Sequence, residues 1–330
     1  MFPTTPRDSD AWDDDVSREI ARSAPGRSGG GFYAGDRPGE HPADDDDELE
    51  EEVRFVPVRR QLSIAIAGFA ALLGAGLILG AQTSGPDSRL PYAIVVLGVQ
   101  ALYVLAFTMA IRPPAAGITA AVSVVAGAAA DYVAVTTEPA GVLRLFYVLG
   151  AAFVVALIGQ TIRPRDRLQL RDALGGTFLV VLGVVAFATL LVLTRKPTGA
   201  QSVLVCLTAV GIAVFAGHLT DAIWPKPRIA PQVPRGAAGV VLGAMLGTLA
   251  AAALGSVLVL PFTPAKGAIL GFVAAGIAAL VDLAVNFSEA GRTLAGEAPT
   301  FWVARHMQGP LGAFSLSLPV TYILTVTMLS

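Results

Sequence analysis

The run AQSVLVCLTAVGIAVFAGH, residues 200–218, decides the class of fold that this chain adopts. It contains no Asp, Glu, Lys or Arg, and its length matches the roughly 20 apolar residues that one helix needs to cross a bilayer. Over the whole 330-residue chain, 54% of the residues are hydrophobic, only 15% are charged and the mean hydropathy is +0.65. Such a composition is typical of an integral membrane protein.

Apolar windows of the same length recur along most of the chain. They lie near residues 62–81, 91–111, 115–135, 142–162, 173–194, 200–218, 236–259, 265–287 and 310–329. We therefore expect an all-α fold, a polytopic membrane helix bundle of about nine transmembrane helices. Only Arg112, Pro113 and Pro114 divide the second window from the third, so the alternative there is a single kinked or re-entrant pair.

The positions of Lys and Arg in the short connections predict the orientation of the bundle, because basic residues concentrate on the cytoplasmic side. With a cytoplasmic N-terminus, the cytoplasmic connections contain Arg54, Arg59, Arg60, Arg112, Arg163, Arg165, Arg167, Arg171, Lys226, Arg228, Arg235, Arg292 and Arg305. The outer connections then contain only Arg89, Arg144, Arg195, Lys196 and Lys266. We expect a multi-pass protein of the plasma (inner) membrane with its N-terminus in the cytoplasm.

The chain divides into three regions by composition. Residues 1–53 are rich in Asp, Glu, Gly, Pro, Arg and Ser, with sixteen acids between Asp8 and Glu52, and predict a disordered acidic cytoplasmic tail. This tail either docks onto a basic partner or serves as a solubilising extension. Residues 54–199 contain the N-terminal transmembrane helices, and residues 200–330 contain the sequence motifs discussed next.

Three aspartates fall within or beside the predicted spans, where a charge is expensive and often functional. Asp131 lies near the end of the third span, Asp221 follows the sixth, and Asp282 lies about a turn and a half inside the eighth. Asp221 and Asp282 share the predicted cytoplasmic side with a basic, proline-rich loop. Aspartate oxygens suit Mg²⁺, which also binds substrate phosphates. The alternative is a pair of helix ends joined by structural salt bridges.

The order of motifs after residue 200 resembles a known family. Thr220 and Asp221 are followed by the loop RIAPQVPRGAAG (228–239), and VDLAVNFSEAGR (281–292) supplies Asp282 and Leu283. RHMQGPLGAFSLSLPVTYIL (305–324) then supplies His306, Gly309, Pro319, Val320 and Tyr322. Residues 200–330 thereby resemble the phosphatidate cytidylyltransferases, membrane enzymes that make CDP-diacylglycerol from CTP and phosphatidic acid.

The resemblance implies roles for six residues. Asp221, Asp282 and His306 become the catalytic candidates, and Asp221 with Asp282 would be the ligands of Mg²⁺ in an active enzyme. Lys226, Arg228 and Arg235 become the candidates for binding the substrate or a lipid head group. The alternative is that these basic residues only mark the cytoplasmic side of the membrane. Membrane lipids are the implied partners, together with another protein in the membrane, and no nucleic acid is expected.

The chain departs from the family pattern at residues that would carry the chemistry. The loop lysines of the family correspond to Gln232 and Arg235, and no aspartate follows Asp282 to match the family's last acidic motif. Transfer of a cytidylyl group needs cations that hold the polyphosphate and stabilise developing charge. We therefore expect a non-catalytic or altered phospholipid-related homologue that uses no cofactor. Two alternatives stay open: an active cytidylyltransferase with Mg²⁺, and a small-solute transporter that uses Asp131 and Asp282.

Overall fold

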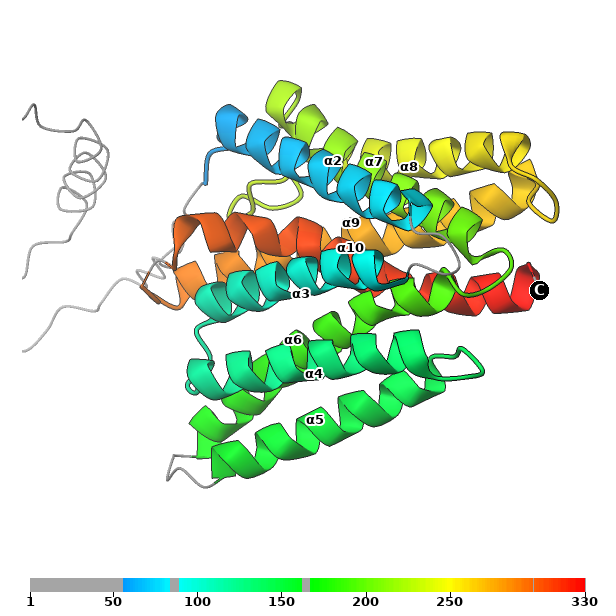
Figure 1. Ribbon diagram of the computed structural model, residues 1–330. Helices are drawn as coiled ribbons and strands as arrows, with labels where there is room; N and C mark the ends of the chain where they lie inside the picture. The colour runs from blue at the N-terminus through cyan, green and yellow to red at the C-terminus, as the bar shows by residue number, and fades with distance from the viewer. Residues whose placement is uncertain (1–55, 84–88, 162–166, 299, 330) are drawn as a thin grey trace, which may run out of the picture. The chain divides into compact units, whose positions relative to one another are not determined.

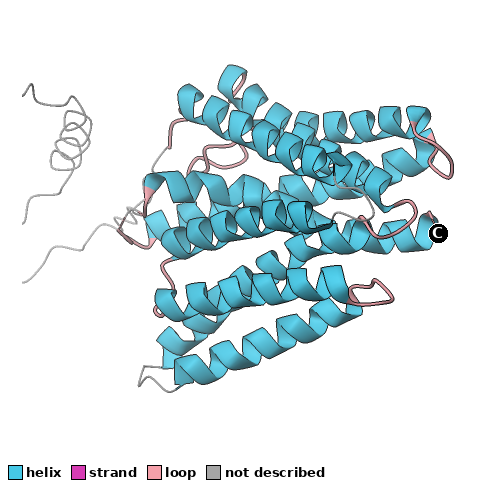
Figure 2. Cartoon of the chain, in the orientation of Figure 1, coloured by secondary structure: helices cyan, strands magenta, loops and turns pink. Residues whose placement is uncertain are grey.

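The computed structural model describes residues 56–83, 89–161, 167–298 and 300–329, and it leaves the side chains of residues 167–170 and 172 undescribed. The described part is built from helices and contains no strand (Figures 1 and 2). The helices are α2 (Arg60–Thr83), α3 (Arg89–Ile111), α4 (Ala116–Thr136), α5 (Leu143–Thr161), α6 (Arg167–Leu193), α7 (Gly199–Ile223), α8 (Ala237–Val257), α9 (Pro264–Leu294) and α10 (Trp302–Met328). All nine are long and apolar enough to cross a bilayer, which confirms the prediction of an all-α polytopic bundle. The predicted acidic tail, residues 1–53, lies outside the described residues.

Helix boundaries differ from the hydropathy windows mainly at polar ends. The second and third windows are separate helices, because α3 ends at Ile111 and α4 begins at Ala116 after a turn in which Arg112 adopts a φ of 48°. The chain is therefore not one continuous kinked helix at this point. Asp221 lies in the last turn of α7 rather than after the span, and His306 lies in the second turn of α10 rather than before its start. Hydropathy windows stop short of these turns because the side chains are polar, although the backbone continues as a helix.

The helices form one bundle with α10 near its middle (Figure 1). On one side, α7 packs against α2, α8 and α9. On the other side, α4 and α6 pack against each other and against both α3 and α5. Helix α10 contacts both groups, because it packs against α2, α7 and α9 as well as α3 and α6. The ends of α7 and α9 and the start of α10 consequently lie at the same end of the bundle, where the candidate site is found.

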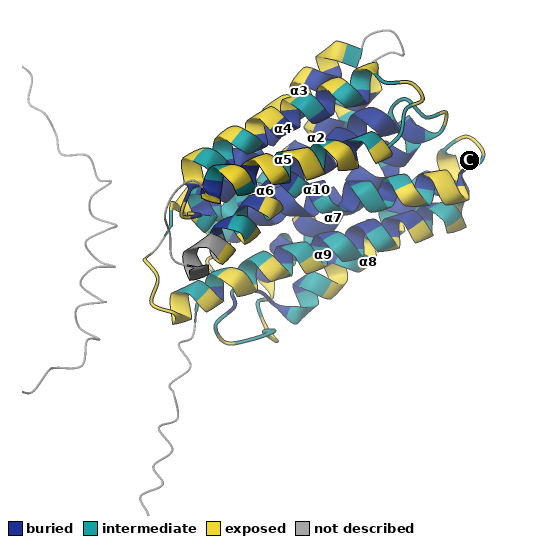
Figure 3. Cartoon of the chain, turned by 90° about the horizontal axis from the view of Figure 1, so that it is seen from below, coloured by how far each residue is buried: buried dark blue, intermediate teal, exposed yellow. Residues whose placement is uncertain are grey.

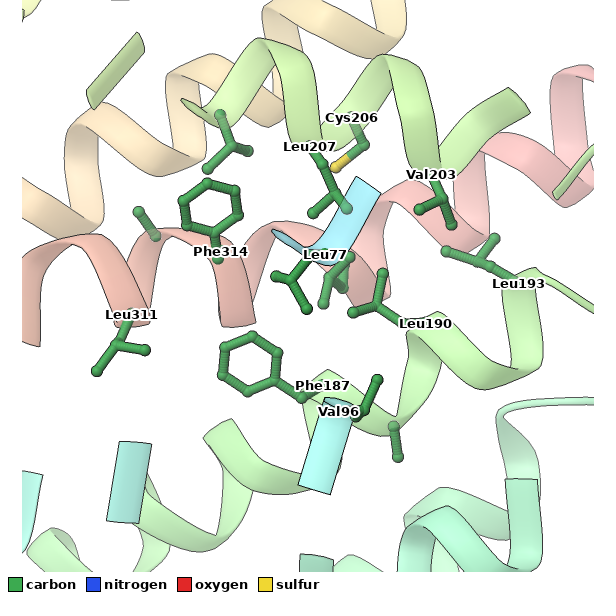
Figure 4. Packing of buried hydrophobic residues seen from close by; sticks show 14 of the residues in the cluster. Leu77, Val96, Phe187, Leu190, Leu193, Val203, Cys206, Leu207, Leu311 and Phe314 are labelled. Carbon is green, nitrogen blue, oxygen red and sulfur yellow. The ribbon is translucent and has the colours of Figure 1, made fainter. Parts of the chain in front are cut away.

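A buried hydrophobic core lies where α2, α3, α6, α7 and α10 meet (Figure 4). Leu77, Phe187, Leu207 and Phe314 are almost completely buried there. The outward faces carry exposed apolar residues (Figure 3), which are stable in lipid and would be an aggregation hazard in water. The division of the surface therefore agrees with a bundle embedded in a bilayer.

Glycines bring α8 into backbone contact with its neighbours. A Cβ atom at Gly243 would lie 2.3 Å from the carbonyl oxygen of Ala213, and one at Gly247 would lie 2.4 Å from that of Ala209. No side chain fits at either position. Small residues that allow such close approach are a common basis of helix association in membranes, where hydrophobicity cannot distinguish a helix from a lipid tail. This close packing holds α8 against α7 along the middle of the two helices.

Candidate functional site

Four charged or polar side chains meet at the end of the bundle where α7 finishes. We call His218, Asp221, Arg235 and Asp282 the Arg235 cluster. Arg235 Nη1 lies 2.8 Å from Asp221 Oδ2, and Arg235 Nη2 lies 3.3 Å from Asp282 Oδ2. His218 Nε2 lies 3.2 Å from both carboxylate oxygens of Asp282. One guanidinium therefore connects two carboxylates that are 61 positions apart in the sequence.

The cluster is closed to solvent. The exposed fractions are 1% for Asp221, 2% for Asp282, 3% for Arg235 and 4% for His218. Burying an ionised side chain is very costly unless an opposite charge lies next to it. With a neutral His218 the two carboxylates and one guanidinium leave a net charge of −1, and with a protonated His218 the charges balance. The buried charges are thus mostly compensated within the chain itself.

The loop between α7 and α8 turns Arg235 inward. Its two ends form a short antiparallel bridge between Arg228 and Gly236, and the N–H of Ala237 donates to the carbonyl oxygen of Pro227 at 2.8 Å. Val233 is completely buried and anchors the tip of the loop. The residue two positions later, Arg235, consequently lies against the bundle and not at the surface of the loop.

Asp221 also stabilises the beginning of α8. The N–H of Gly236, the residue that precedes α8, donates to Asp221 Oδ1 at 3.0 Å. The first N–H groups of a helix have no partner within the helix, and the helix dipole favours a negative charge beside them. Asp221 therefore has two structural roles, since it accepts from the start of α8 and pairs with Arg235.

Glycines make room for both carboxylates. A Cβ atom at Gly239 on α8 would lie 2.2 Å from Asp221 Oδ1, and one at Gly309 on α10 would lie 2.2 Å from Asp282 Oδ1. Any side chain at these two positions would collide with the cluster. The contact of Gly239 with a carboxylate is not visible in any local pattern of the sequence. The cluster therefore joins α7, α8, α9 and α10.

Several polar atoms of the cluster retain hydrogen-bonding capacity. Arg235 Nε and Nη1 and the Oδ2 atoms of Asp221 and Asp282 have no well-aligned hydrogen-bond partner among the described residues. The ion pair between Arg235 and Asp221 is close in distance but lies off the axis of a good hydrogen bond. Charge compensation, more than hydrogen bonding, holds this group together.

The other residues named from the sequence lie outside the Arg235 cluster. His306 Nδ1 lies 2.6 Å from the carbonyl oxygen of Trp302, one turn earlier in α10, and its ring lies against the Trp302 ring. Lys226 is exposed at the surface of the loop. Arg228 donates from Nη1 to the carbonyl oxygen of Val56, which ties the loop to the segment before α2. The structure brings Asp221, Asp282 and Arg235 together and does not bring His306, Lys226 or Arg228 to them.

His218 is the member of the cluster that was not singled out from the sequence. It lies three residues before Asp221, and residues three apart share a face of a helix. This spacing could have predicted that His218 lies near Asp221. It could not have predicted the contact with Asp282, because Asp282 is on another helix.

The cluster does not fit a metal ion in this arrangement. Asp221 and Asp282 are suitable oxygen ligands, but the Arg235 guanidinium lies between them and repels a divalent cation. Within the described ranges, no group of three or more His, Cys, Asp or Glu side chains is placed to hold a metal. The arrangement supplies a buried ion-pair network and no cation-binding carboxylate pair.

No protein-family model matches the chain, and no curated protein matches it.

Proposed function

We propose that this protein is a non-catalytic relative of the phosphatidate cytidylyltransferases that binds anionic phospholipid at the cytoplasmic surface of the membrane. The observation that carries the proposal is the bridge that Arg235 forms between Asp221 and Asp282. Three separate motifs carried the resemblance, and the side chains of Asp221, Arg235 and Asp282 meet in one cluster, with Gly309 packed against Asp282. This convergence supports a common origin of the site.

The same bridge argues against catalysis. In cytidylyl transfer a phosphate oxygen of the lipid attacks the α-phosphorus of CTP, and the bond to the leaving pyrophosphate breaks. Cations must hold the polyphosphate during this step. Arg235 is buried and compensated by two carboxylates, so it is not presented to a polyphosphate. Because the loss of one preorganised electrostatic group typically lowers a rate by about 10²- to 10³-fold, the combined changes leave little or no activity.

The surface of the loop retains features that favour lipid binding. Lys226 is exposed, and Trp224, two positions earlier in the sequence, is 66% exposed. Tryptophan is enriched at the boundary between lipid and water, and a basic residue near an anionic membrane surface contributes about 1 kcal/mol of attraction. In the proposed orientation this pair faces the anionic inner leaflet.

The decisive test of catalysis is a product assay. The full chain is purified in mild detergent and given labelled CTP, phosphatidic acid and Mg²⁺, with a known phosphatidate cytidylyltransferase as the positive control. We expect no labelled CDP-diacylglycerol from this chain. The opposite result would be labelled product from the wild type and none from Asp221→Asn or Asp282→Asn. That result would establish the second candidate function, an active cytidylyltransferase. The polar atoms of the Arg235 cluster that lack a hydrogen-bond partner would then contact the substrate.

Lipid binding needs a separate test. Native mass spectrometry in detergent counts phosphatidic acid and phosphatidylcholine molecules bound to the wild type, to Lys226→Ala and to Lys266→Ala. Lys266 is the matched control because it lies at the start of α9, at the opposite end of the bundle from the loop. We expect Lys226→Ala alone to weaken phosphatidic acid binding. Equal binding of both lipids by all three proteins would contradict the proposal.

A small-solute transporter is the third reading. It would use Asp131 and Asp282 as sites within the membrane. These two carboxylates contact different helices, since Asp131 meets α3 and Asp282 meets α7 and the loop before α8. The described contacts therefore do not support a transport site shared by the two.

A further inference from the structure

Asp131 is buried in a different part of the bundle from the Arg235 cluster. It lies on α4 with an exposed fraction of 5%, and its Oδ1 accepts a hydrogen bond from Gln100 Nε2 on α3 at 2.9 Å. The same Nε2 also donates to the carbonyl oxygen of Val184 on α6 at 3.0 Å. Both hydrogens of the amide are therefore used, and Asp131 receives only one of them. One amide holds three helices together at this point.

Gly127 fixes the position of the Gln100 amide. A Cβ atom at Gly127, one turn before Asp131, would lie 2.9 Å from Gln100 Oε1. The amide is consequently confined between α4 and α6. Asp131 Oδ2 and Gln100 Oε1 are both buried without a hydrogen-bond partner among the described residues. The site thus contains oxygen acceptors in excess of donors.

No described cation compensates Asp131. The three arginines at this end of the bundle have other partners. Arg195 donates to the carbonyl oxygen of Ala134 and pairs with Glu138, and Arg89 donates to the carbonyl oxygen of Val135 and lies 3.9 Å from Glu138. Arg144 donates to the carbonyl oxygen of Glu138 at 2.9 Å. Among the described side chains of the helices packed against α4, the buried titratable groups are the phenols of Tyr92 and Tyr103 on α3, and Tyr103 donates to the carbonyl oxygen of Leu179. None of these groups supplies a positive charge to Asp131.

An isolated carboxylate in such a place cannot stay ionised at an acceptable cost, because transfer of a bare charge into a medium of low dielectric costs tens of kcal/mol and the group neutralises instead. Two ligands neutralise a carboxylate: a metal cation or a proton. A hard cation requires about six oxygen ligands, and the described surroundings offer only Asp131 Oδ2 and Gln100 Oε1 with free capacity. The proton is the ligand that fits.

We propose that Asp131 is a proton-binding site inside the bundle, at which the side chain is a carboxylic acid held by the Gln100 amide. The proton comes from water and forms an O–H bond at Oδ2, while Oδ1 continues to accept from Gln100. This site lies on α3, α4 and α6 and shares no residue with the Arg235 cluster. It therefore stands independently of the proposed function.

Infrared spectroscopy of the full chain in detergent at neutral pH tests the proposal directly, because a carboxylic acid and a carboxylate absorb at different frequencies. Subtracting the spectrum of Asp131→Asn from that of the wild type should reveal the C=O stretch of a protonated acid. Asp282→Asn is the matched control, because the ion-paired Asp282 should contribute carboxylate bands to its own difference spectrum. Carboxylate bands in the Asp131→Asn difference would overturn the proposal.

A second variant covers the case in which Asp131→Asn does not fold. Gln100→Leu removes the hydrogen bond to Oδ1 but keeps the acid. We expect the acid band to move to a higher frequency, because the C=O bond strengthens when it no longer accepts a hydrogen bond. An unchanged acid band in Gln100→Leu would show that the acid lies elsewhere and would refute the assignment to Asp131.

Discussion

Replacement of Arg235 by methionine is the most direct test of the Arg235 cluster. Methionine retains the length and much of the apolar stem of arginine but removes the charge. The variant leaves Asp221 and Asp282 buried beside each other without the guanidinium that bridges them. Removal of one partner from a buried ion pair typically costs about 3 to 5 kcal/mol, because an uncompensated charge is left behind. Since Arg235 serves two carboxylates, we expect the upper part of this range.

The measurement is the free energy of unfolding in mixed detergent micelles with increasing dodecyl sulfate. The control variant is Lys226→Met, which changes a basic residue of the same loop at an exposed position and should alter stability by no more than about 0.5 kcal/mol. Comparison of the two variants separates the buried ion pairs from any general effect of lowering the positive charge of the loop.

A triple variant distinguishes charge compensation from simple packing. Combining Arg235→Met with Asp221→Asn and Asp282→Asn removes every charge of the ion pairs, and replacement of a whole buried ion pair by neutral groups is often nearly neutral. We expect the triple variant to regain most of the stability lost by Arg235→Met. A loss below about 1 kcal/mol for Arg235→Met, the value of an exposed pair, would refute the reasoning, as would a triple variant no more stable than the single one.

Three further predictions follow from the described contacts. Gly239→Ala should lower the stability in thermal unfolding by about 1 to 3 kcal/mol, because the added Cβ would lie 2.2 Å from Asp221 Oδ1. The control is Gly276→Ala, where a Cβ would meet nothing within 4 Å, and this variant should be neutral or slightly stabilising. Equal effects would show that the contact at Gly239 is unimportant. Arg235→Met should bind Mn²⁺, detected by electron paramagnetic resonance, while the wild type and the triple variant should not; binding by the wild type would show that the guanidinium does not exclude metal. Glu138→Gln should cost less than about 1 kcal/mol, because Glu138 is 72% exposed although it pairs with the buried Arg195, and a larger loss would contradict the view that solvent screens this pair.

The fold could be predicted from the sequence because the bilayer imposes one strong requirement on it. Each span needs an uninterrupted apolar stretch, and the windows at residues 91–111 and 115–135 correspond closely to α3 and α4. The ends were less predictable where polar residues continue a helix. Hydropathy placed the start of the last span at residue 310, whereas α10 begins at Trp302.

The members of the candidate site could be named in part, but not their contacts. Asp221 and Asp282 attracted attention because charge near a span is unusual, and the loop arginines because they are basic. Arg235 turns inward, whereas Lys226 of the same loop is exposed, and no local pattern in the sequence predicts this difference. That difference depends on Val233, whose burial anchors the loop, and on glycines that admit the carboxylates. Such information lies in the packing of distant segments.

The identity of the loop cation is consistent with the non-catalytic role that we propose. The resemblance places Gln232 and Arg235 where the family has lysines. A lysine ammonium is a compact charge on a flexible stem, which can pair with a phosphate, whereas the planar guanidinium of arginine presents several donors in a fixed geometry. Arg235 uses two of its nitrogens to reach Asp221 and Asp282 at once, a geometry that the single nitrogen of lysine reproduces poorly. The same positive charge thereby joins α7, α9 and the start of α8, and it is buried between two carboxylates.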